Sequence, residues 1–329
     1  MPLPDFVERI AESTEPQPYI VTGGKFVCFA LSAKRAAVQA VVDRYFNIPS
    51  GGEAEYRVLA DYVIAGLLHI ADSRSGSRED QDDQAFYVES DLLFFVPVAY
   101  GKTVNGTFRS ERVVWFVPLV FVDTAAAVAE GREVYGFPKL LARCDMPRVA
   151  GDPAYFAVHT GVYQGVPVAR QLREATIFEA IRHDAATFGE REETWTSGLD
   201  AITGMLDLLR INSNPGGGLG AIWEGAREKL EMLSPDQRLL VLKQFRDARD
   251  GTKACLLQIV ECPIRVTGFA GAGLLKGDWT VTLPTFETLD IARDLGIVSN
   301  GGPITPLAAY WTEIDCVMEN GIVVWSAGG

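Results

Sequence analysis

The chain has 329 residues, of which 48% are hydrophobic and 22% are charged. This length and composition support a sizeable hydrophobic core and exclude a disordered or collagen-like chain. The formal net charge of −13 argues against a nucleic-acid partner, because phosphate groups are bound by basic surfaces and no block rich in Lys and Arg is present.

The first half of the chain is predicted to be rich in strands. Lys25–Leu31 is an apolar run, and Ala33–Tyr45 has the spacing of an amphipathic helix. The polar stretch Ser73–Gln84 is predicted to be a solvated loop. The remaining predictions here are extended segments at Tyr56–Ile70, Ala85–Tyr100, Arg112–Val122 and Tyr155–Gln164, with a short helix at Asp123–Glu130.

The segment from Gln171 to Asp250 is predicted to be a mainly helical insertion within a single domain that spans residues 1–329. Ser234 and Gln237 form a capping box with Pro235 at the first helical position. Three apolar residues then fall on one helical face before Gly251, namely Leu239, Leu242 and Phe245.

Within this insertion, Asn214–Ala221 formally matches the dinucleotide pattern G-x-G-x-x-A. No strand is predicted before it, so we interpret it as a connector.

Strand character returns after Gly251. Glycines 268, 271 and 273 interrupt this region and predict bulges or bends of a curved sheet. The predicted elements are strands at Ala254–Gly268, Trp279–Leu283, Tyr310–Met318 and Gly321–Trp325, and a helix at Thr288–Leu295.

Several common chemistries and locations are disfavoured. The sequence has no G-x-S-x-G, no H-E-x-x-H and only three widely spaced histidines, so we predict neither a serine hydrolase nor a metal site. The longest apolar run, Val113–Val122, is too short to span a membrane and contains a proline. Five cysteines without C-x-x-C pairing fit reduced thiols, and cytoplasm is the predicted compartment.

One lysine is surrounded by apolar sequence. In GREVYGFPKLLA, Lys139 follows Tyr135, Phe137 and Pro138 and precedes two leucines. An ammonium group among apolar walls loses hydration, its pKa falls, and the neutral amine can attack a carbonyl group. The alternative is a lysine that extends from a turn to solvent, which is the commoner situation for local sequence of this kind.

The segment GREVYGFPKLLA closely resembles the lysine segment of acetoacetate decarboxylases. Upstream, FYVESD resembles the glutamate segment of that family, and DTAAAVAEGRE, ECPIRVTG and YWTEIDCVMENGIVVW also run parallel to it. The resemblance covers most of the chain outside residues 171–250.

This resemblance implies a fold, a chemistry and an assembly. The implied fold is α+β, a curved, largely antiparallel sheet closing into a cone or barrel with peripheral helices. Lys139 would form a Schiff base with a small keto acid and Glu89 would be the active-site acid, in a lyase that needs no metal and no organic cofactor. Residues Arg132, Glu133, Tyr135 and Phe137 would shape the lysine loop or bind substrate. The family also implies a homo-oligomer.

Two departures from the family pattern affect the substrate. Leu140 stands where the decarboxylases carry a second lysine, and Ser32 aligns with an arginine that holds the substrate carboxylate. A related branch of the superfamily, the pyruvate-type aldolase-dehydratases and hydratases, is therefore an alternative, with Tyr310 in acid-base catalysis. For Tyr310, the alternative is an ordinary aromatic residue of the sheet. A catalytically inactive, ligand-binding member of the fold is the third alternative.

Overall fold

The computed structural model describes residues 4–10, 12–77, 87–146, 155–164, 171–184, 191–195, 236–275 and 277–327. The pattern noted at Asn214–Ala221, and Ser234 and Pro235 of the capping box, lie outside the described residues. No helix of the described part is long and apolar enough to cross a membrane.

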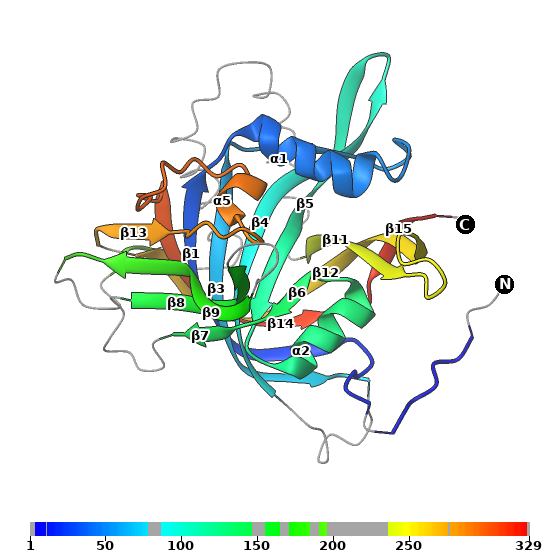
Figure 1. Cartoon of the computed structure of the whole chain (residues 1–329), viewed down its shortest axis with the longest axis horizontal. Helices are drawn as coiled ribbons and strands as arrows, with labels where there is room; N and C mark the ends of the chain where they lie inside the picture. The colour runs from blue at the N-terminus through cyan, green and yellow to red at the C-terminus, as the bar shows by residue number, and fades with distance from the viewer. Residues whose placement is uncertain are drawn as a thin grey trace.

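An eleven-stranded sheet dominates the structure (Figure 1). Its strand order is β2-β4-β3-β1-β14-β12-β11-β5-β6, with β10 and β15 also paired to β12. The strands are β1 (Tyr19–Ser32), β2 (Glu55–Val58), β3 (Tyr62–Ser75), β4 (Tyr87–Val104), β5 (Thr107–Val122), β6 (Lys139–Leu141), β10 (Arg191–Trp195), β11 (Asp236–Arg246), β12 (Ala254–Leu275), β14 (Ala308–Met318) and β15 (Ile322–Ser326).

The pairings of this sheet close on themselves. Strand β4 also pairs with β5, so that β4, β3, β1, β14, β12, β11 and β5 form a hydrogen-bonded ring. All pairings in the ring are antiparallel except the short β11–β5 contact. The predicted largely antiparallel sheet is confirmed, although the fold is more sheet-rich than the term α+β suggests. The predicted cone or barrel stays a prediction, since pairings define a ring and not its shape.

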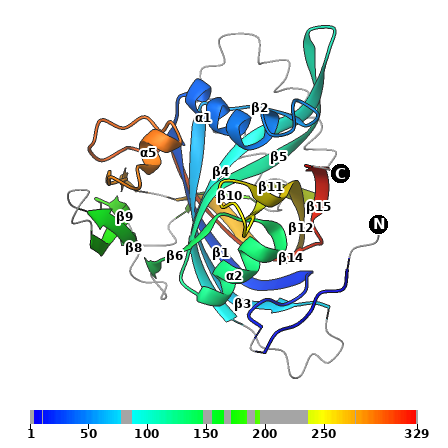
Figure 2. The same cartoon turned by 45° about the vertical axis from the view of Figure 1, so that its right-hand side comes forward.

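A second, four-stranded sheet lies on the opposite side of the ring from β11 and β15 (Figures 1 and 2). Its order is β13-β9-β8-β7. The strands are β7 (Arg143–Asp145), β8 (Tyr155–Gln164), β9 (Gln171–Arg182) and β13 (Trp279–Thr282). The helices are short: α1 (Arg35–Val42), the π-helical turn η1 (Asp43–Asn47), α2 (Ala125–Glu130), the π-helical turn η3 (Gly131–Tyr135) and α5 (Ile291–Asp294).

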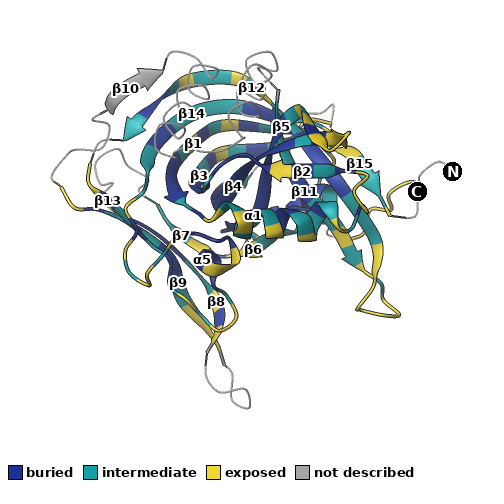
Figure 3. Ribbon diagram, turned by 90° about the horizontal axis from the view of Figure 1, so that it is seen from above, coloured by how far each residue is buried: buried dark blue, intermediate teal, exposed yellow. Residues whose placement is uncertain are grey.

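Strands β3, β4 and β5 are apolar along much of both faces because both faces are covered. On β4, Phe94 and its neighbours of the same parity pack in the largest core, together with Phe46 of η1 and Phe178 of β9. Leu93 and Phe95 point to the other face. A strand that is buried on both faces has a continuous run of apolar residues in its sequence, as β4 has here. Figure 3 shows buried residues concentrated in β3, β4 and β5.

The β4–β5 hairpin is closed by a two-residue turn. Val104 pairs with Thr107, and the residues between them, Asn105 and Gly106, have positive φ angles of 52° and 78°. Asn-Gly is the preferred pair for such a turn, because its twist matches that of the flanking strands. The turn sets the register of the hairpin at its tip, and two register shifts follow before the cavity-facing residues of β4.

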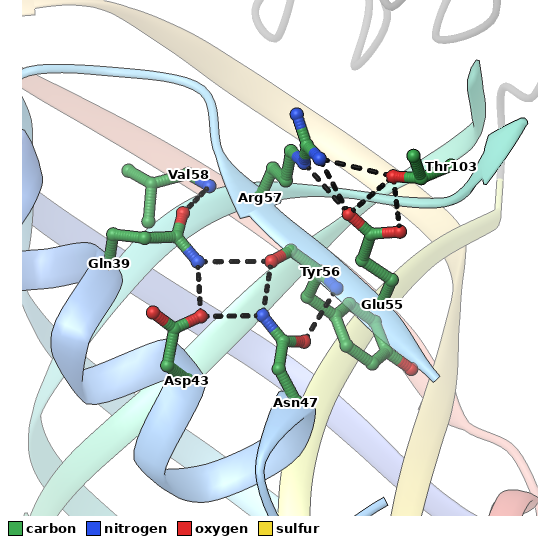
Figure 4. A network of polar contacts seen from close by, with 8 residues as sticks. All are labelled: Gln39, Asp43, Asn47, Glu55, Tyr56, Arg57, Val58 and Thr103. Atoms are coloured by element: carbon green, nitrogen blue, oxygen red, sulfur yellow. Dashed lines mark hydrogen bonds and ion pairs between the residues drawn. The ribbon is translucent and has the colours of Figure 1, made fainter. Parts of the chain in front are cut away.

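Side chains of α1 and η1 complete the edge strand β2 (Figure 4). The Gln39 carboxamide accepts from Val58 N at 2.8 Å and donates to Tyr56 O at 3.1 Å. Asn47 accepts from Tyr56 N at 2.8 Å and donates to Tyr56 O at 2.9 Å. These amides take the place of a neighbouring strand, so the exposed backbone edge is blocked.

The predicted helix after Gln237 is wrong. Residues 236–246 form β11, which pairs along its length with β12 and briefly with β5. Leu239 faces the ring interior, whereas Leu240 joins the core on the other face. Apolar residues at 239–242 fit a helix and a doubly buried strand equally well, and the long partner β12 selects the strand. Strands β9 and β10 likewise replace predicted helix, and residues 196–235 lie outside the described part.

A buried ion-pair cluster strengthens the β11–β5 junction, where only Leu239–Trp115 and Leu240–Phe116 pair. Glu261 of β12 is fully buried and accepts from Arg112 Nη2 at 2.7 Å and from Arg238 Nη1 at 2.9 Å. The cluster ties β5, β11 and β12 together. Further along β12, the register shifts beside Gly268 and Gly271, which confirms the predicted irregularities.

Candidate active site

A cavity of about 290 Å³ lies inside the strand ring. Each of the seven ring strands contributes lining side chains, and so do η3 and β6. Most of these side chains are apolar, for example Phe26, Leu68 and Leu239. A concave, largely apolar space with a few convergent polar groups is the usual form of a small-molecule site.

Lys139 and Glu89 meet in this cavity. Lys139 is the first residue of β6, which lies parallel to β5, and its Nζ donates to Glu89 Oε1 of β4 at 2.5 Å. The side chains are only 13% and 4% exposed, respectively. Fifty residues apart in the sequence, they form a charge-assisted hydrogen bond that water hardly reaches.

The loop before Lys139 is folded tightly around Gly131. Helix α2 continues into η3, which ends at Tyr135 and is followed by Gly136 with a φ of 95°. The Gly131 carbonyl group accepts from Gly136 N at 3.0 Å and Phe137 N at 2.9 Å. A Cβ atom at Gly131 would lie 2.5 Å from Lys139 Cδ, so the glycine provides the space that the lysine stem occupies.

The electrostatics of Lys139 differ from the prediction. Burial lowers the pKa of Lys139, but Glu89, Asp91 and Glu130 together raise it above its ordinary value. The prediction of a lowered pKa was wrong because it weighed only the adjacent sequence. Three carboxyl groups from outside that segment surround the amine, and the neighbouring Leu140 is 42% exposed instead of forming a wall.

Two of these acids were not predicted. Asp91 is buried two residues beyond Glu89 on the same face of β4. Burial, with Glu89 second, raises the pKa of Asp91 well above its ordinary value. Glu130 ends α2 and accepts a short hydrogen bond from the Tyr87 hydroxyl group, and burial raises its pKa too. Strand periodicity gave a signal for Asp91, since residues 89 and 91 share a face.

Tyr310 lines the same cavity, but at a different height along the strands. When the strand pairings are followed from β4 through β3 and β1 to β14, Glu89 lies close to the height of Ile314. Ile314 is four residues along β14 from Tyr310. Four residues span about 13 Å of strand. Burial raises the pKa of Tyr310 well above its ordinary value, and a hydrogen bond with Cys28 adds to this.

The other candidate residues of the lysine loop hold its shape. Arg132 Nη1 donates to the Lys139 carbonyl group at 3.3 Å, and Glu133 lies 3.8 Å from Arg9 at the surface. The Tyr135 hydroxyl group donates to Glu319 O at 2.9 Å, and the Tyr135 ring packs edge-on against Phe137. Tyr135 and Phe137 line the cavity, whereas Arg132 and Glu133 do not.

Ser32 is not brought to the cavity. It ends β1 opposite Tyr62, and its carbonyl group accepts from Val298 N at 2.7 Å. Among the described residues that line the cavity, Lys139 is the only cationic one. Gln237, whose Oε1 accepts from Trp115 Nε1 at 2.7 Å, lines the cavity as well; the sequence marked Gln237 only as part of a capping box.

Comparison with known proteins shows the family of this chain. Residues 3–175, more than half of the 329, match the family model of acetoacetate decarboxylase (ADC). The chain belongs to the acetoacetate decarboxylase family. The match includes Glu89, Asp91 and Lys139, and it confirms the resemblance noted in the sequence. No curated protein matches the chain.

Solved structures agree with this family at the level of the fold. An acetoacetate decarboxylase from Legionella pneumophila has a TM-score of 0.61 at 16% identity, covering 100% of this chain and 94% of its own. The enduracididine biosynthesis enzyme MppR, complexed with pyruvate, has a TM-score of 0.55 at 13% identity, covering 96% and 93%. An acetoacetate decarboxylase-like enzyme from Sphingomonas wittichii RW1 has a TM-score of 0.54 at 12% identity, covering 96% of both chains.

Proposed function

We propose that this member of the acetoacetate decarboxylase family is a lyase that binds a small keto acid as a Schiff base on Lys139. The observation that carries the proposal is the Lys139–Glu89 pair, with 2.5 Å between Nζ and Oε1, inside an apolar cavity. An amine confined beside a carboxylate in a substrate-sized space is suited to covalent catalysis on a carbonyl group. Cytoplasmic location and a homo-oligomer remain predictions from the sequence.

The ion pair has a role on both sides of imine formation. Before the reaction, Glu89 balances the buried ammonium charge. Once the ketone has condensed and water has left, the same carboxylate lies beside the protonated imine and keeps it charged. The charged imine withdraws electrons from the neighbouring carbon, which is the condition for losing CO2 or breaking another C–C bond.

The carboxylate beside Lys139 favours decarboxylation. Glu89 accepts a hydrogen bond from the Lys139 ammonium group, and a substrate carboxylate bound beside the Glu89 carboxylate would be repelled by it. Loss of neutral CO2 relieves that repulsion, which favours cleavage over simple binding.

Condensation followed by dehydration is the second candidate. Tyr310 lies about 13 Å along the strand from the level of Glu89 but within the same cavity, which leaves length for a second substrate. MppR, which shares the fold, has been solved in complex with the condensation product of pyruvate and imidazole 4-carboxaldehyde. In this chain, Tyr310 would then act on the aldehyde part.

Product analysis separates these functions. The wild type, Lys139→Ala and the exposed control Lys253→Ala are incubated with acetoacetate, or with pyruvate and an aldehyde, and products are followed by NMR. We expect CO2 and acetone from acetoacetate with the wild type and the control, and none with Lys139→Ala. A dehydrated condensation product would favour the second candidate. No turnover of any keto acid by folded wild type would indicate a ligand-binding protein.

A further inference from the structure

Asp91 is a buried acid of the cavity that neither the sequence nor the Lys139–Glu89 pair accounts for. It is 3% exposed, lines the cavity, and follows Glu89 at the next position on the same strand face. Within the described part of the chain, its Oδ1 has no hydrogen-bond partner. Burying an ionised carboxylate without partners is costly, whereas the neutral acid tolerates the same place.

The charges around Asp91 point the same way. Glu89 lies on its own strand, Asp123 follows β5, and Lys139 lies on β6; the Cys144 thiol of β7 is also near. The single cation among these groups is already paired with Glu89 at 2.5 Å. Burial, Glu89 and Asp123 raise the pKa of Asp91 and Lys139 lowers it, with a net rise.

The two carboxyl groups share one buried strand face. Glu89 and Asp91 are two residues apart on β4 and both line the cavity. Like charges in one buried site disfavour each other, so one of the two groups is more stable as the neutral acid. Glu89 accepts from the Lys139 ammonium group and is assigned as the carboxylate; Asp91, with its unpartnered oxygen, is assigned as the acid.

We propose that Asp91 is the general acid of the reaction, which delivers its proton to the carbon of the Lys139-bound enamine while Glu89 holds the charge of the imine. The inference rests on the proposed imine chemistry. It moves the proton transfer from Glu89, which the family resemblance suggested, to its neighbour.

The electrons and protons balance in this scheme. When CO2 leaves, the electron pair of the broken C–C bond forms the C=C bond of the enamine, and the C=N pair moves to nitrogen. The enamine then returns its pair, its terminal carbon takes the Asp91 proton, and the protonated imine forms again. Water converts that imine into the ketone and the Lys139 ammonium group, and a solvent proton restores Asp91.

The test separates imine formation from proton transfer. Wild type, Asp91→Asn and Asp247→Asn are incubated with pyruvate in D2O. The adduct is trapped with borohydride and its mass is measured, and deuterium entry into the methyl group of pyruvate is followed by proton NMR. Asn matches the shape of Asp but transfers no proton. Asp247 is the control because its Oδ1 accepts from Arg249 N at 2.8 Å and it does not line the cavity.

We expect all three proteins to give the adduct, and exchange by Asp91→Asn alone to fall by about 10²-fold or more, the usual contribution of a general acid. If the rate of deuterium exchange by Asp91→Asn lay within about threefold of the wild-type rate, the inference would be overturned and the proposed function would remain. Absence of the adduct in wild type would overturn both.

A second measurement needs no variant. In wild type, acetone release from acetoacetate should fall as the pH rises through the pKa of Asp91, because the enamine left by CO2 loss takes its proton from the acid form. Adduct formation should not fall with it. If acetone release and adduct formation changed with pH in the same way, the role of Asp91 would be contradicted.

Discussion

Replacing Gly131 with alanine tests whether the structure positions Lys139 correctly. The new Cβ atom would lie 2.5 Å from Lys139 Cδ and 2.8 Å from Cε, whereas ordinary contacts begin at 3.4 Å. The lysine stem must therefore move by about 0.9 Å at Cδ. The obstacle is a flexible side chain and not backbone, so the protein can yield by displacing the amine.

The expected effects on activity and on stability differ. Misplacing a reacting group by about 1 Å costs on the order of 10²-fold in rate. Adding a methyl group to a well-packed core lowers the free energy of unfolding by about 1–3 kcal/mol. Because the lysine side chain can move, we expect a loss at the low end of this range. Replacing glycine by alanine within η3 returns about 0.5–1 kcal/mol of backbone entropy. We therefore expect nearly unchanged stability and strongly reduced imine formation.

The assay is the rate of borohydride-trapped adduct formation with a keto acid, measured beside the thermal midpoint. Gly251→Ala is the matched control, because a Cβ atom at Gly251 would meet nothing within 4 Å. Trapping by Gly131→Ala at the wild-type rate would show that Lys139 does not occupy the described position during the reaction. A large loss of stability would show that the loop is held more rigidly than the contacts imply.

Three further predictions follow from the charged groups. Glu89→Gln removes the largest influence that raises the pKa of Lys139, so that pKa should fall. In a plot of the rate of imine trapping against pH, the acidic limb should therefore move to lower pH. An unchanged acidic limb would contradict the Lys139–Glu89 ion pair. Glu261→Ala leaves two guanidinium groups unpaired and should lower the free energy of unfolding, measured in urea, by about 3–5 kcal/mol. The loss should lie near the lower end of this range because Arg112 and Arg238 are partly exposed. The isosteric variant Glu261→Gln should lose less stability. Because the folded-state pKa of Asp91 is raised, its contribution to stability is complete below the unfolded pKa and is lost as pH rises through the folded pKa. As the pH rises above about 4, the ordinary pKa of an aspartate, the thermal midpoint of Asp91→Asn should therefore fall less than that of wild type. Equal slopes of the thermal midpoint against pH would count against a protonated Asp91.

The strands of the ring were largely predictable because their composition is decisive. Phe, Val and Trp follow one another along Arg112–Val122, and the structure places that run in β5, covered on both faces. Strand β11 was not predictable in the same way. Its apolar residues satisfy helical and strand spacing alike, and the partner that selects the strand, β12, begins only at Ala254.

The Lys139–Glu89 pair of the candidate site was predictable from the sequence, whereas the other acids and the electrostatics of the site were not. The lysine and glutamate segments could be recognised by their motifs, and the structure joins Lys139 to Glu89. The direction of the pKa shift of Lys139 depends on Glu89 and Asp91, about fifty residues away, and on Glu130 at the end of α2. Only the strand register brings these charges together, so local sequence could not reveal them.

The central claim is that Lys139 forms an imine with a keto acid. The most direct measurement is peptide mass spectrometry after borohydride reduction in the presence of acetoacetate or pyruvate, with Lys139→Ala beside wild type. The account predicts a substrate-sized mass increase on the peptide that contains Lys139, and none in the variant. An adduct on another lysine, or no adduct on a folded wild type, would contradict it.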